Sequence, residues 1–379
     1  MRAAARFGAR ILVSEIVLRV PRTSEIRRIL IVKWSALGDV ALATAAIEDI
    51  RLAFPRAVLH LDTLPSAKRL FVHDPRFDAV FALPMRDRKQ RLRVHRQWLR
   101  RVRAARYDLI VDLQSSDHTR LLLACLAFGR GGVPRRWGIR RGFPYTLAPP
   151  TDAGPHPPMR MRALLARAGI PAHTPRAVLH PSPAQCARVA ALLRELGAAS
   201  RRYAVFLPGS QAGGWLKRWG VERYAELGVL LHARGIERIL VIGAREEIAD
   251  CARIVASIQA RVPDVAFHLA DLDLLEIAPA CADAACIVAN DTGTAHIAAA
   301  AGRPLWVLCG PTDPRRVRPS GATAVQADFH CLNCYRKTCR WGPTPQCLER
   351  IEPAAVLALA LGDADTIDGL TLHADAATS

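Results

Sequence analysis

The sequence has 379 residues, of which 51% are hydrophobic, and 53 Lys and Arg residues against 34 Asp and Glu residues give a formal net charge of +19. A chain of this length exceeds what a single hydrophobic core usually supports, so we expect two domains. No apolar run approaches the roughly 20 residues that span a bilayer, so we do not expect an integral membrane protein.

The N-terminal segment and the cysteines favour a cytoplasmic location. Residues 11–20 resemble a secretory signal, but Glu15 interrupts the apolar run and no small-residue cleavage site follows. The 10 cysteines are too few and too unevenly placed for a disulfide scaffold. The positive charge comes almost entirely from arginine and predicts an anionic partner, which is nucleic acid, a membrane surface or a phosphorylated glycolipid.

Short β-rich runs alternate with longer helical patterns along the chain. The expected strands are residues 28–33, 58–62, 79–83, 108–113, 203–207, 238–243, 265–269, 286–289 and 304–309. A Pro-rich stretch and a helical pattern at residues 182–197 separate the first four strands from the rest. This order predicts an α/β protein with two doubly wound parallel sheets and a border near Ala198.

In such sheets, ligands bind beyond the carboxyl ends of the strands. The first strand runs into Lys33-Trp34-Ser35-Ala36-Leu37-Gly38-Asp39-Val40, which delivers a glycine and a carboxylate to a helix start. Asp39 is a candidate general base, and Gly38 would leave room for a substrate. The alternative is that Asp39 only caps the helix.

Three loops in the second half carry candidate ligand-binding residues, and two of them have the composition of a phosphate site. One contains Ser210 and reaches Lys217, whose charge would neutralise a diphosphate. Another reads Asn290-Asp291-Thr292-Gly293-Thr294-Ala295-His296, and the free N–H groups at the start of its helix would hold a pyrophosphate. The third, Gly310-Pro311-Thr312-Asp313-Pro314, is first a turn and second a candidate sugar-binding loop.

Together these segments resemble glycosyltransferase family nine, the ADP-heptose:lipopolysaccharide heptosyltransferases. The similarity covers residues 28–359 and is carried by Lys33-x-Ser35-x-x-Gly38-Asp39-Val40, Lys217-x-Trp219, Asp291-Thr292-Gly293-x-x-His296 and the 310–314 loop. The resemblance implies a GT-B fold, in which two Rossmann-like domains face a central cleft. We therefore expect an N-terminal extension over residues 1–27, an acceptor-binding domain over 28–198 and a nucleotide-sugar-binding domain over 199–379.

The resemblance also implies a reaction, in which heptose passes from ADP-heptose to the inner core of lipopolysaccharide with inversion. It places Asp39 as the catalytic base, Lys217 at the diphosphate, and Asp291, Thr292, Gly293 and His296 around the donor. From their positions in the same loops, we expect Ser210 and Thr312 at the donor as well, and Ser35 and Gly38 on the acceptor side. No metal or cofactor is expected. The sequence departs from the family at Leu42 and Ala45, where many members carry His and Pro, and at Gly220, where Pro usually follows the tryptophan.

Several features permit other interpretations. Cys331, Cys334, Cys339 and Cys347 are spaced compatibly with tetrahedral zinc, although reduced thiols or disulfides are alternatives. Their presence and the basic charge suggest a nucleic-acid-binding protein, but the spacing is not that of a standard zinc finger. A Rossmann-type oxidoreductase is a weak alternative, because no Gly-x-Gly-x-x-Gly follows the first strand. A transferase of the same fold with another nucleotide sugar or glycan acceptor also remains open.

Two basic segments bear on location. Residues 86–106 contain ten Lys or Arg residues and one acid, Asp87, and are expected to face an anionic acceptor or membrane, with Trp98 and Leu99 on the apolar side. Residues 1–27 would form either a short amphipathic surface helix or a packing helix. We expect a cytoplasmic enzyme peripheral to the inner membrane, with ADP-heptose or a related nucleotide sugar and an anionic lipopolysaccharide acceptor as partners and no nucleic acid.

Overall fold

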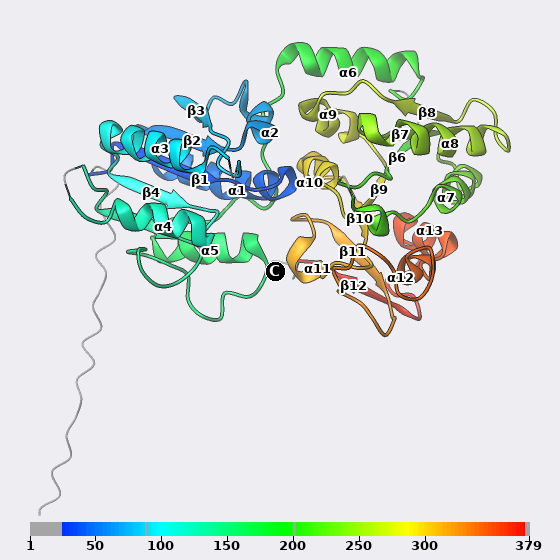
Figure 1. Ribbon diagram of the computed structural model, residues 1–379. Coiled ribbons are helices and arrows are strands. Elements are labelled where there is room, and N and C mark those ends of the chain that lie inside the picture. The colour runs from blue at the N-terminus through cyan, green and yellow to red at the C-terminus, as the bar shows by residue number, and fades with distance from the viewer. Residues whose placement is uncertain (1–24, 88, 130, 200–201, 212, 376–379) are drawn as a thin grey trace, which may run out of the picture.

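A computed structural model describes residues 25–375 except 88, 130, 200–201 and 212. The chain forms two α/β domains that lie side by side (Figure 1). No helix in the described ranges is both long and apolar enough to cross a membrane. Most of the expected N-terminal extension lies outside the described residues.

The first domain contains a five-stranded parallel sheet in the order β3-β2-β1-β4-β5. The strands are β1 (Arg28–Lys33), β2 (Val58–Thr63), β3 (Ala79–Ala82), β4 (Leu109–Asp112) and β5 (Arg135–Gly138). Its helices are α1 (Leu37–Ala53), α2 (Pro65–Lys68), α3 (Arg91–Ala105), α4 (Asp117–Cys125) and α5 (Pro157–Arg167), with the 3-10 helix η2 (Arg69–Phe71). The order is that of a Rossmann-like domain, with a switch point between β1 and β4.

The second domain repeats this order in a seven-stranded sheet, β12-β11-β10-β9-β6-β7-β8. The strands are β6 (Tyr203–Leu207), β7 (Arg238–Ile242), β8 (Ala266–Leu269), β9 (Cys286–Asn290), β10 (Leu305–Leu308), β11 (Thr323–Ala327) and β12 (Leu370–His373). β12 pairs antiparallel with β11, whereas the other strands are parallel. The expected pair of doubly wound sheets is therefore confirmed, with one antiparallel strand added at an edge.

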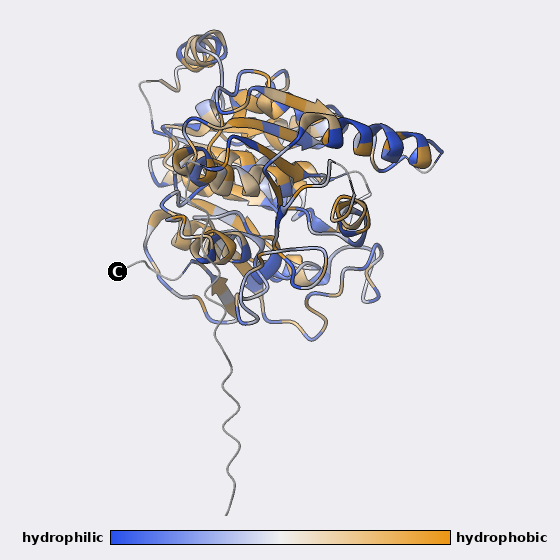
Figure 2. Ribbon diagram, turned by 90° about the vertical axis from the view of Figure 1, so that its left-hand side faces the viewer, coloured by the Kyte–Doolittle hydropathy of each residue, from blue (hydrophilic) through white to orange (hydrophobic). Residues whose placement is uncertain are grey.

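Helices cover both faces of the second sheet. They are α6 (Pro183–Glu195), α7 (Val221–Ala233), α8 (Ile248–Gln259), α9 (Ile277–Cys281), α10 (Gly293–Ala298), α11 (Pro314–Val317), α12 (Gln346–Glu349) and α13 (Pro353–Leu361). The 3-10 helices are η3 (Trp215–Lys217), η4 (Arg245–Glu247), η5 (Leu274–Glu276) and η6 (Ala299–Ala301). The strands are the most hydrophobic parts of the fold and lie inside it, as Figure 2 shows.

One hydrophobic core runs through both domains. It includes Ile29 and Ile47 of the first domain and Leu240 and Ile297 of the second, and it is continuous because α1 packs against α10. Two further cores fill the outer faces, beneath α3 and α4 in the first domain and beneath α7, α8 and α13 in the second. The helix-to-helix contact therefore fixes the edges of the two sheets relative to each other.

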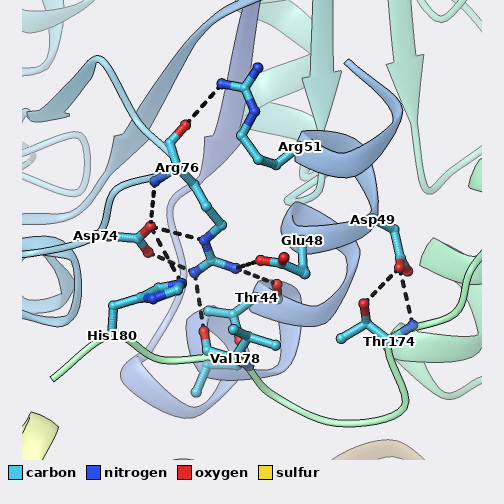
Figure 3. A network of polar contacts seen from close by, with 10 residues as sticks. Thr44, Glu48, Asp49, Arg51, Asp74, Arg76, Thr174, Val178 and His180 are labelled. Atoms are coloured by element: carbon cyan, nitrogen blue, oxygen red, sulfur yellow. Dashed lines mark hydrogen bonds and ion pairs between the residues drawn. The ribbon is translucent and has the colours of Figure 1, made fainter. Parts of the chain in front are cut away.

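The segment that leaves the first domain is tied to it by a buried arginine. The Arg76 guanidinium donates to both carboxylate oxygens of Asp74, to the backbone carbonyl of Thr44 and to that of Val178 (Figure 3). Thr174 donates to the Asp49 carboxylate on α1. These contacts hold residues 174–178 on the first domain.

Helix α6 follows directly and packs on the second domain. Ser182 caps it through a capping box with Gln185. Arg188 forms two hydrogen bonds of 2.8 and 2.9 Å with the Glu276 carboxylate, and α6 lies against α9 at the top of Figure 1. The proposed border near Ala198 lies on the far side of this helix.

Candidate active site

Asp39 lies in the first turn of α1, beyond the carboxyl end of β1. The N-cap position is Ala36, and no side chain makes a capping hydrogen bond there. The capping interpretation of Asp39 is therefore wrong. The carboxylate is exposed and accepts no hydrogen bond from the described residues. An unengaged carboxylate at a sheet switch point is free to accept a substrate proton.

Lys217 ends η3 and forms an ion pair across the carboxyl edge of the second sheet. Its Nζ lies 2.7 Å from Oδ2 of Asp291, which follows β9. The Thr312 hydroxyl donates to the same oxygen at 2.8 Å. Asp291 is 8% exposed and Lys217 is 19% exposed, so the pair is largely screened from solvent but the ammonium still reaches a cavity. Thr312 thus acts on Lys217 through Asp291.

Asn290, at the end of β9, connects the loops on either side of Lys217. Its side-chain oxygen accepts from the Trp219 backbone N–H at 3.2 Å and from the Tyr224 hydroxyl at 3.1 Å. Its side-chain amide donates to the carbonyls of Pro208 and Gly209. The amide is fully buried, so these bonds have little competition from water. Asn290 therefore sets the distance between the 208–210 loop and η3.

Glu247 holds the 208–210 loop from the other side. Its buried carboxylate accepts from the Ser210 N–H at 2.5 Å and from the Ala244 N–H at 2.8 Å. A Cβ at Gly209 would lie 2.1 Å from this carboxylate, so any other residue here would displace the carboxylate from the two N–H groups. The Ser210 hydroxyl in turn accepts from Arg218, which also pairs with Asp250 at 2.7 Å.

Gly38 and His296 bring the two domains into contact. A Cβ at Gly38 would lie 2.5 Å from Cδ2 of the His296 ring. The imidazole therefore fills the space that a side chain at Gly38 would need, while Gly38 also lines the cavity between the domains, so its place beside the acceptor stays a prediction. Burial lowers the pKa of His296, and its Nδ1 has no hydrogen-bond partner in the described part of the chain. The glycine permits the close approach of α1 and α10.

Most of the expected site residues line one cavity of about 450 Å³ between the domains. Asp39 and Gly38 enter it from the first domain, opposite loops of the second. The expected residues from the second domain on its wall are Ser210, Lys217, Asp291, Thr292, Gly293 and His296. Ser35 and Thr312 are not among the lining residues. Ser35 is buried and hydrogen-bonded to the side chain of Gln114.

Comparison with known protein families identifies the family of this chain. Residues 95–344, well over half of the sequence, match the family described as glycosyltransferase family 9 (heptosyltransferase). The chain belongs to glycosyltransferase family 9. The protein is therefore an enzyme that transfers a glycosyl group, and the nucleic-acid-binding and oxidoreductase alternatives are set aside.

Known proteins similar to this family 9 glycosyltransferase share its length and fold. It is 28% identical over 361 residues to lipopolysaccharide heptosyltransferase 1 of Pseudomonas aeruginosa, covering 87% of this chain and 96% of that protein. It is 27% identical to lipooligosaccharide heptosyltransferase 2 of Haemophilus influenzae, covering 87% and 97%.

Solved structures show the same fold. ADP-heptose lps heptosyltransferase II of E. coli superposes with a TM-score of 0.65 at 22% identity, covering 89% of this chain and 99% of that one. The glycosyl transferase family 9 structure from Veillonella parvula gives 0.71 at 18% identity, covering 89% and 98%. The expected GT-B architecture is thereby confirmed.

The cysteine loop of this family 9 enzyme lies beside the loops that carry Lys217 and Thr312. Cys331, Cys334, Cys339 and Cys347 line a cavity of about 150 Å³ together with Leu216 and Pro311, the neighbours of Lys217 and Thr312. All four thiols are free. Within the described ranges, no group of three or more His, Cys, Asp or Glu side chains is arranged to hold a metal ion.

Three residues that shape the site were missed by sequence reasoning. Glu247 and Asn290 position loops through their side chains, and Arg218 fixes Ser210. A carboxylate shortly after Gly243, in a loop that follows a parallel strand, was the available signal for Glu247. Gly220, the departure from the family pattern, adopts a φ of 111° at the start of α7, which glycine tolerates and proline cannot adopt.

The first domain of this glycosyltransferase carries the basic segment on α3. Arg93, Arg96 and Arg100 line an open hollow on the outer face, and none of them has an acidic partner among the described residues. On the inner face, Trp98 is fully buried and Leu99 packs against the same core, as expected. Trp98 donates to Asp62, and burial raises the pKa of that carboxyl to about 7.

Proposed function

We propose that this enzyme transfers heptose from ADP-heptose to the inner core of lipopolysaccharide, with inversion at the anomeric carbon. The observation that supports this most directly is that Asp39 of the first domain and Lys217 of the second line one cavity. A base and a cation on opposite walls suit a reaction in which one substrate loses a proton and the other loses a diphosphate. The names of the similar proteins supply the sugar and the acceptor.

Lys217 carries the donor side of the proposal. As the bond between the anomeric carbon and the ADP oxygen breaks, negative charge grows on the leaving diphosphate. The ammonium offsets that charge, and Asp291 and Thr312 hold it in position. Thr292, Gly293 and His296 complete the wall around the donor. Because the cation comes from the protein chain, we expect activity to survive EDTA.

Asp39 carries the acceptor side. Its carboxylate takes the proton from an acceptor hydroxyl as that oxygen forms its bond to the anomeric carbon. The base does not need a raised pKa, because the oxocarbenium-like centre acidifies the attacking hydroxyl. Attack from the face opposite the departing ADP inverts the configuration.

The basic outer face of α3 supports a location at the inner face of the cytoplasmic membrane. Arg93, Arg96 and Arg100 have no acidic partners in the described structure, and Leu92 beside them is 69% exposed. Clustered arginines with an exposed apolar side chain suit anionic phospholipid. We propose that the enzyme is peripheral to that membrane and binds it through α3.

A donor panel tests the proposed reaction. The purified enzyme is incubated with deacylated lipid A–Kdo and with ADP-heptose, ADP-glucose, UDP-glucose or GDP-mannose, and product is detected by mass spectrometry. Addition of one heptose with ADP-heptose, at a rate at least about tenfold above the other donors, is expected. Faster transfer from a UDP or GDP donor would contradict the proposed donor while leaving the family assignment intact.

A further inference from the structure

A second cavity of about 520 Å³ opens beside Asp39. Asp39 and Val317 belong to its wall as well as to the wall of the donor cavity, so the two cavities meet at the carboxylate. The rest of its wall is formed by Ile139, Pro155, Pro157, Arg160, Arg316 and Tyr335. It is therefore bounded by both domains, like the first cavity.

Two arginines supply most of the charge on this wall. Arg160 comes from α5 of the first domain and Arg316 from α11 of the second. Neither makes an ion pair within the described structure, whereas their neighbours do: Arg315 binds Asp313 at 2.9 Å and Arg140 binds Asp117 at 3.0 Å. Arg160 and Arg316 are thus available to an external anion.

The pKa of Arg160 reflects an excess of positive charge in this region. Burial lowers the pKa of the Arg160 guanidinium, and the positive charges of Arg140 and Arg316 lower it further. Among the described residues that line this cavity, Asp39 is the one carboxylate, so two positive charges face a single negative charge. A bound oxyanion would balance the remaining positive charge and relieve the repulsion between the two guanidinium groups.

A buried contact between the domains fixes this arrangement. Nε2 of His156, the residue that precedes α5, lies 3.0 Å from the backbone oxygen of Arg318, just after α11. His156 is 3% exposed. The first turn of α5, which carries Arg160, is therefore held against the end of α11, which carries Arg316. The two guanidinium groups share a cavity because the helices that bear them are joined here.

We infer that this second cavity is the acceptor subsite, and that Arg160 and Arg316 bind a carboxylate or phosphate of the acceptor. The inference rests on the proposed function, since it takes Asp39 as the base. An acceptor hydroxyl has to reach Asp39 and the donor sugar together, and a molecule in the second cavity meets both at the shared wall. Guanidinium groups bind carboxylate and phosphate through paired hydrogen bonds, which would fix the attacking hydroxyl.

Steady-state kinetics of two variants tests the assignment. Arg160→Gln and Arg316→Gln each remove one charge, and Arg194→Gln removes one from the exposed face of α6 as a matched control. With deacylated lipid A–Kdo as acceptor and saturating ADP-heptose, we expect the acceptor KM to rise about tenfold or more in each cavity variant. The KM for ADP-heptose should stay within about twofold. Acceptor KM values equal to that of Arg194→Gln would overturn the inference.

Acceptor analogues distinguish the two sources of the oxyanion. One analogue carries the Kdo carboxylate as its methyl ester, and the other lacks the lipid A phosphates. The analogue that lacks the oxyanion bound by the arginines should bind wild type about tenfold more weakly than the full acceptor does. The arginine variants should bind that analogue as tightly as wild type does. If the affinity of wild type exceeds that of the variants by the same factor for both analogues as for the full acceptor, neither oxyanion contacts these arginines and the inference is wrong.

A binding measurement separates this inference from the proposed reaction. Calorimetric titration of deacylated lipid A–Kdo into ADP-loaded protein needs no turnover. Binding that weakens at least tenfold in Arg160→Gln/Arg316→Gln supports the subsite even if heptose is not the sugar transferred. Equal binding by wild type and the double variant, or no binding by wild type, rejects the subsite. Loss of ADP-heptose turnover in wild type rejects the proposed reaction alone.

Discussion

The space that a side chain at residue 38 would need is filled by the imidazole of His296, so Gly38 and His296 join the two domains through a direct contact. A Cβ on Gly38 would approach Cδ2 of the ring to 2.5 Å, so the ring or one of the two helices would have to shift. Gly293 lies at the same interface, but a Cβ there would make only an ordinary contact of 3.5 Å with that of Leu37.

Gly38→Ala should therefore destabilise the protein even though alanine is the better helix former. The helical preference contributes about 1 kcal/mol in favour of alanine, and overpacking costs about 1 to 3 kcal/mol. We expect a lower melting temperature for Gly38→Ala and recovery in Gly38→Ala/His296→Ala, measured against His296→Ala in a double-mutant cycle. Equal effects of the glycine change in both backgrounds would show that the ring is not the obstacle.

Asp39→Asn should slow turnover strongly and leave the fold intact. The carboxylate makes no capping bond, so its conversion to an amide removes little stability. As the proposed base, it should cost at least about a hundredfold in kcat. Rates are measured with saturating ADP-heptose and acceptor, and ADP affinity by calorimetry should match wild type. Near-normal turnover in this folded variant would assign the base elsewhere.

Lys217→Ala should slow transfer by about a hundredfold, because the leaving diphosphate loses its cation. The variant also leaves the nearly buried Asp291 without its ion-pair partner, so lost stability is a competing cause. Lys217→Ala/Asp291→Asn removes both charges and provides the control. If the double variant recovers stability but not turnover, Lys217 acts on the reaction. Full recovery of turnover would restrict the lysine to a structural role.

Charge reversal on α3 tests the membrane surface. The triple variant with Arg93, Arg96 and Arg100 changed to Glu should lose most of its binding to anionic vesicles, since each basic residue contributes about 1 kcal/mol at such a surface. Arg56, Arg194 and Arg261 are exposed elsewhere and give a triple variant of equal charge. Cosedimentation with phosphatidylglycerol vesicles compares the two. Equal loss in both variants would mean that net charge, rather than α3, binds the membrane.

Asp62 should make stability fall as pH rises. Burial raises its pKa to about 7 in the folded protein, whereas an unfolded chain titrates it near the ordinary value of 3.8. The folded state therefore binds the proton more tightly, and its contribution is present below about pH 4 and lost as pH rises to 7. Asp62→Asn should remove a pH-dependent difference of a few kcal/mol in the unfolding free energy. Parallel curves for wild type and variant between pH 4 and 8 would contradict this.

The sequence predicts those strands whose run of apolar residues matches their burial in the fold. Residues 28–33 and 203–207 are apolar runs that form fully or nearly fully buried central strands, and their expected bounds are those of β1 and β6. The missed strands β5, β11 and β12 lie toward the sheet edges. β5 begins with two arginines, so its sequence does not look like that of a buried strand. The Arg136 guanidinium is nevertheless buried, because it donates hydrogen bonds to backbone carbonyls that come close only in the folded chain.

The site divides in a similar way. Asp39, Lys217 and the 291–296 loop were predicted to lie together, and they line one cavity because strand ends bring such residues to one edge of each sheet. Glu247 and the two arginines proposed for the acceptor, Arg160 and Arg316, were not predicted, since each depends on a contact between segments far apart in sequence. Ser35 was expected beside the acceptor but is bonded to Gln114 instead. The sequence around one strand end cannot show that a side chain from a neighbouring loop, here Gln114, already forms a hydrogen bond with the Ser35 hydroxyl.

The contacts around Arg76 and Arg188 leave very little chain between the domains. Val178 is bonded to the first domain and Ser182 already caps the helix that belongs to the second. The ring of Pro181 fixes the φ angle of that residue. The backbone can therefore rotate only about the few bonds on either side of Pro181. A rotation that parts Gly38 from His296 swings the second domain and α6 together about this short pivot.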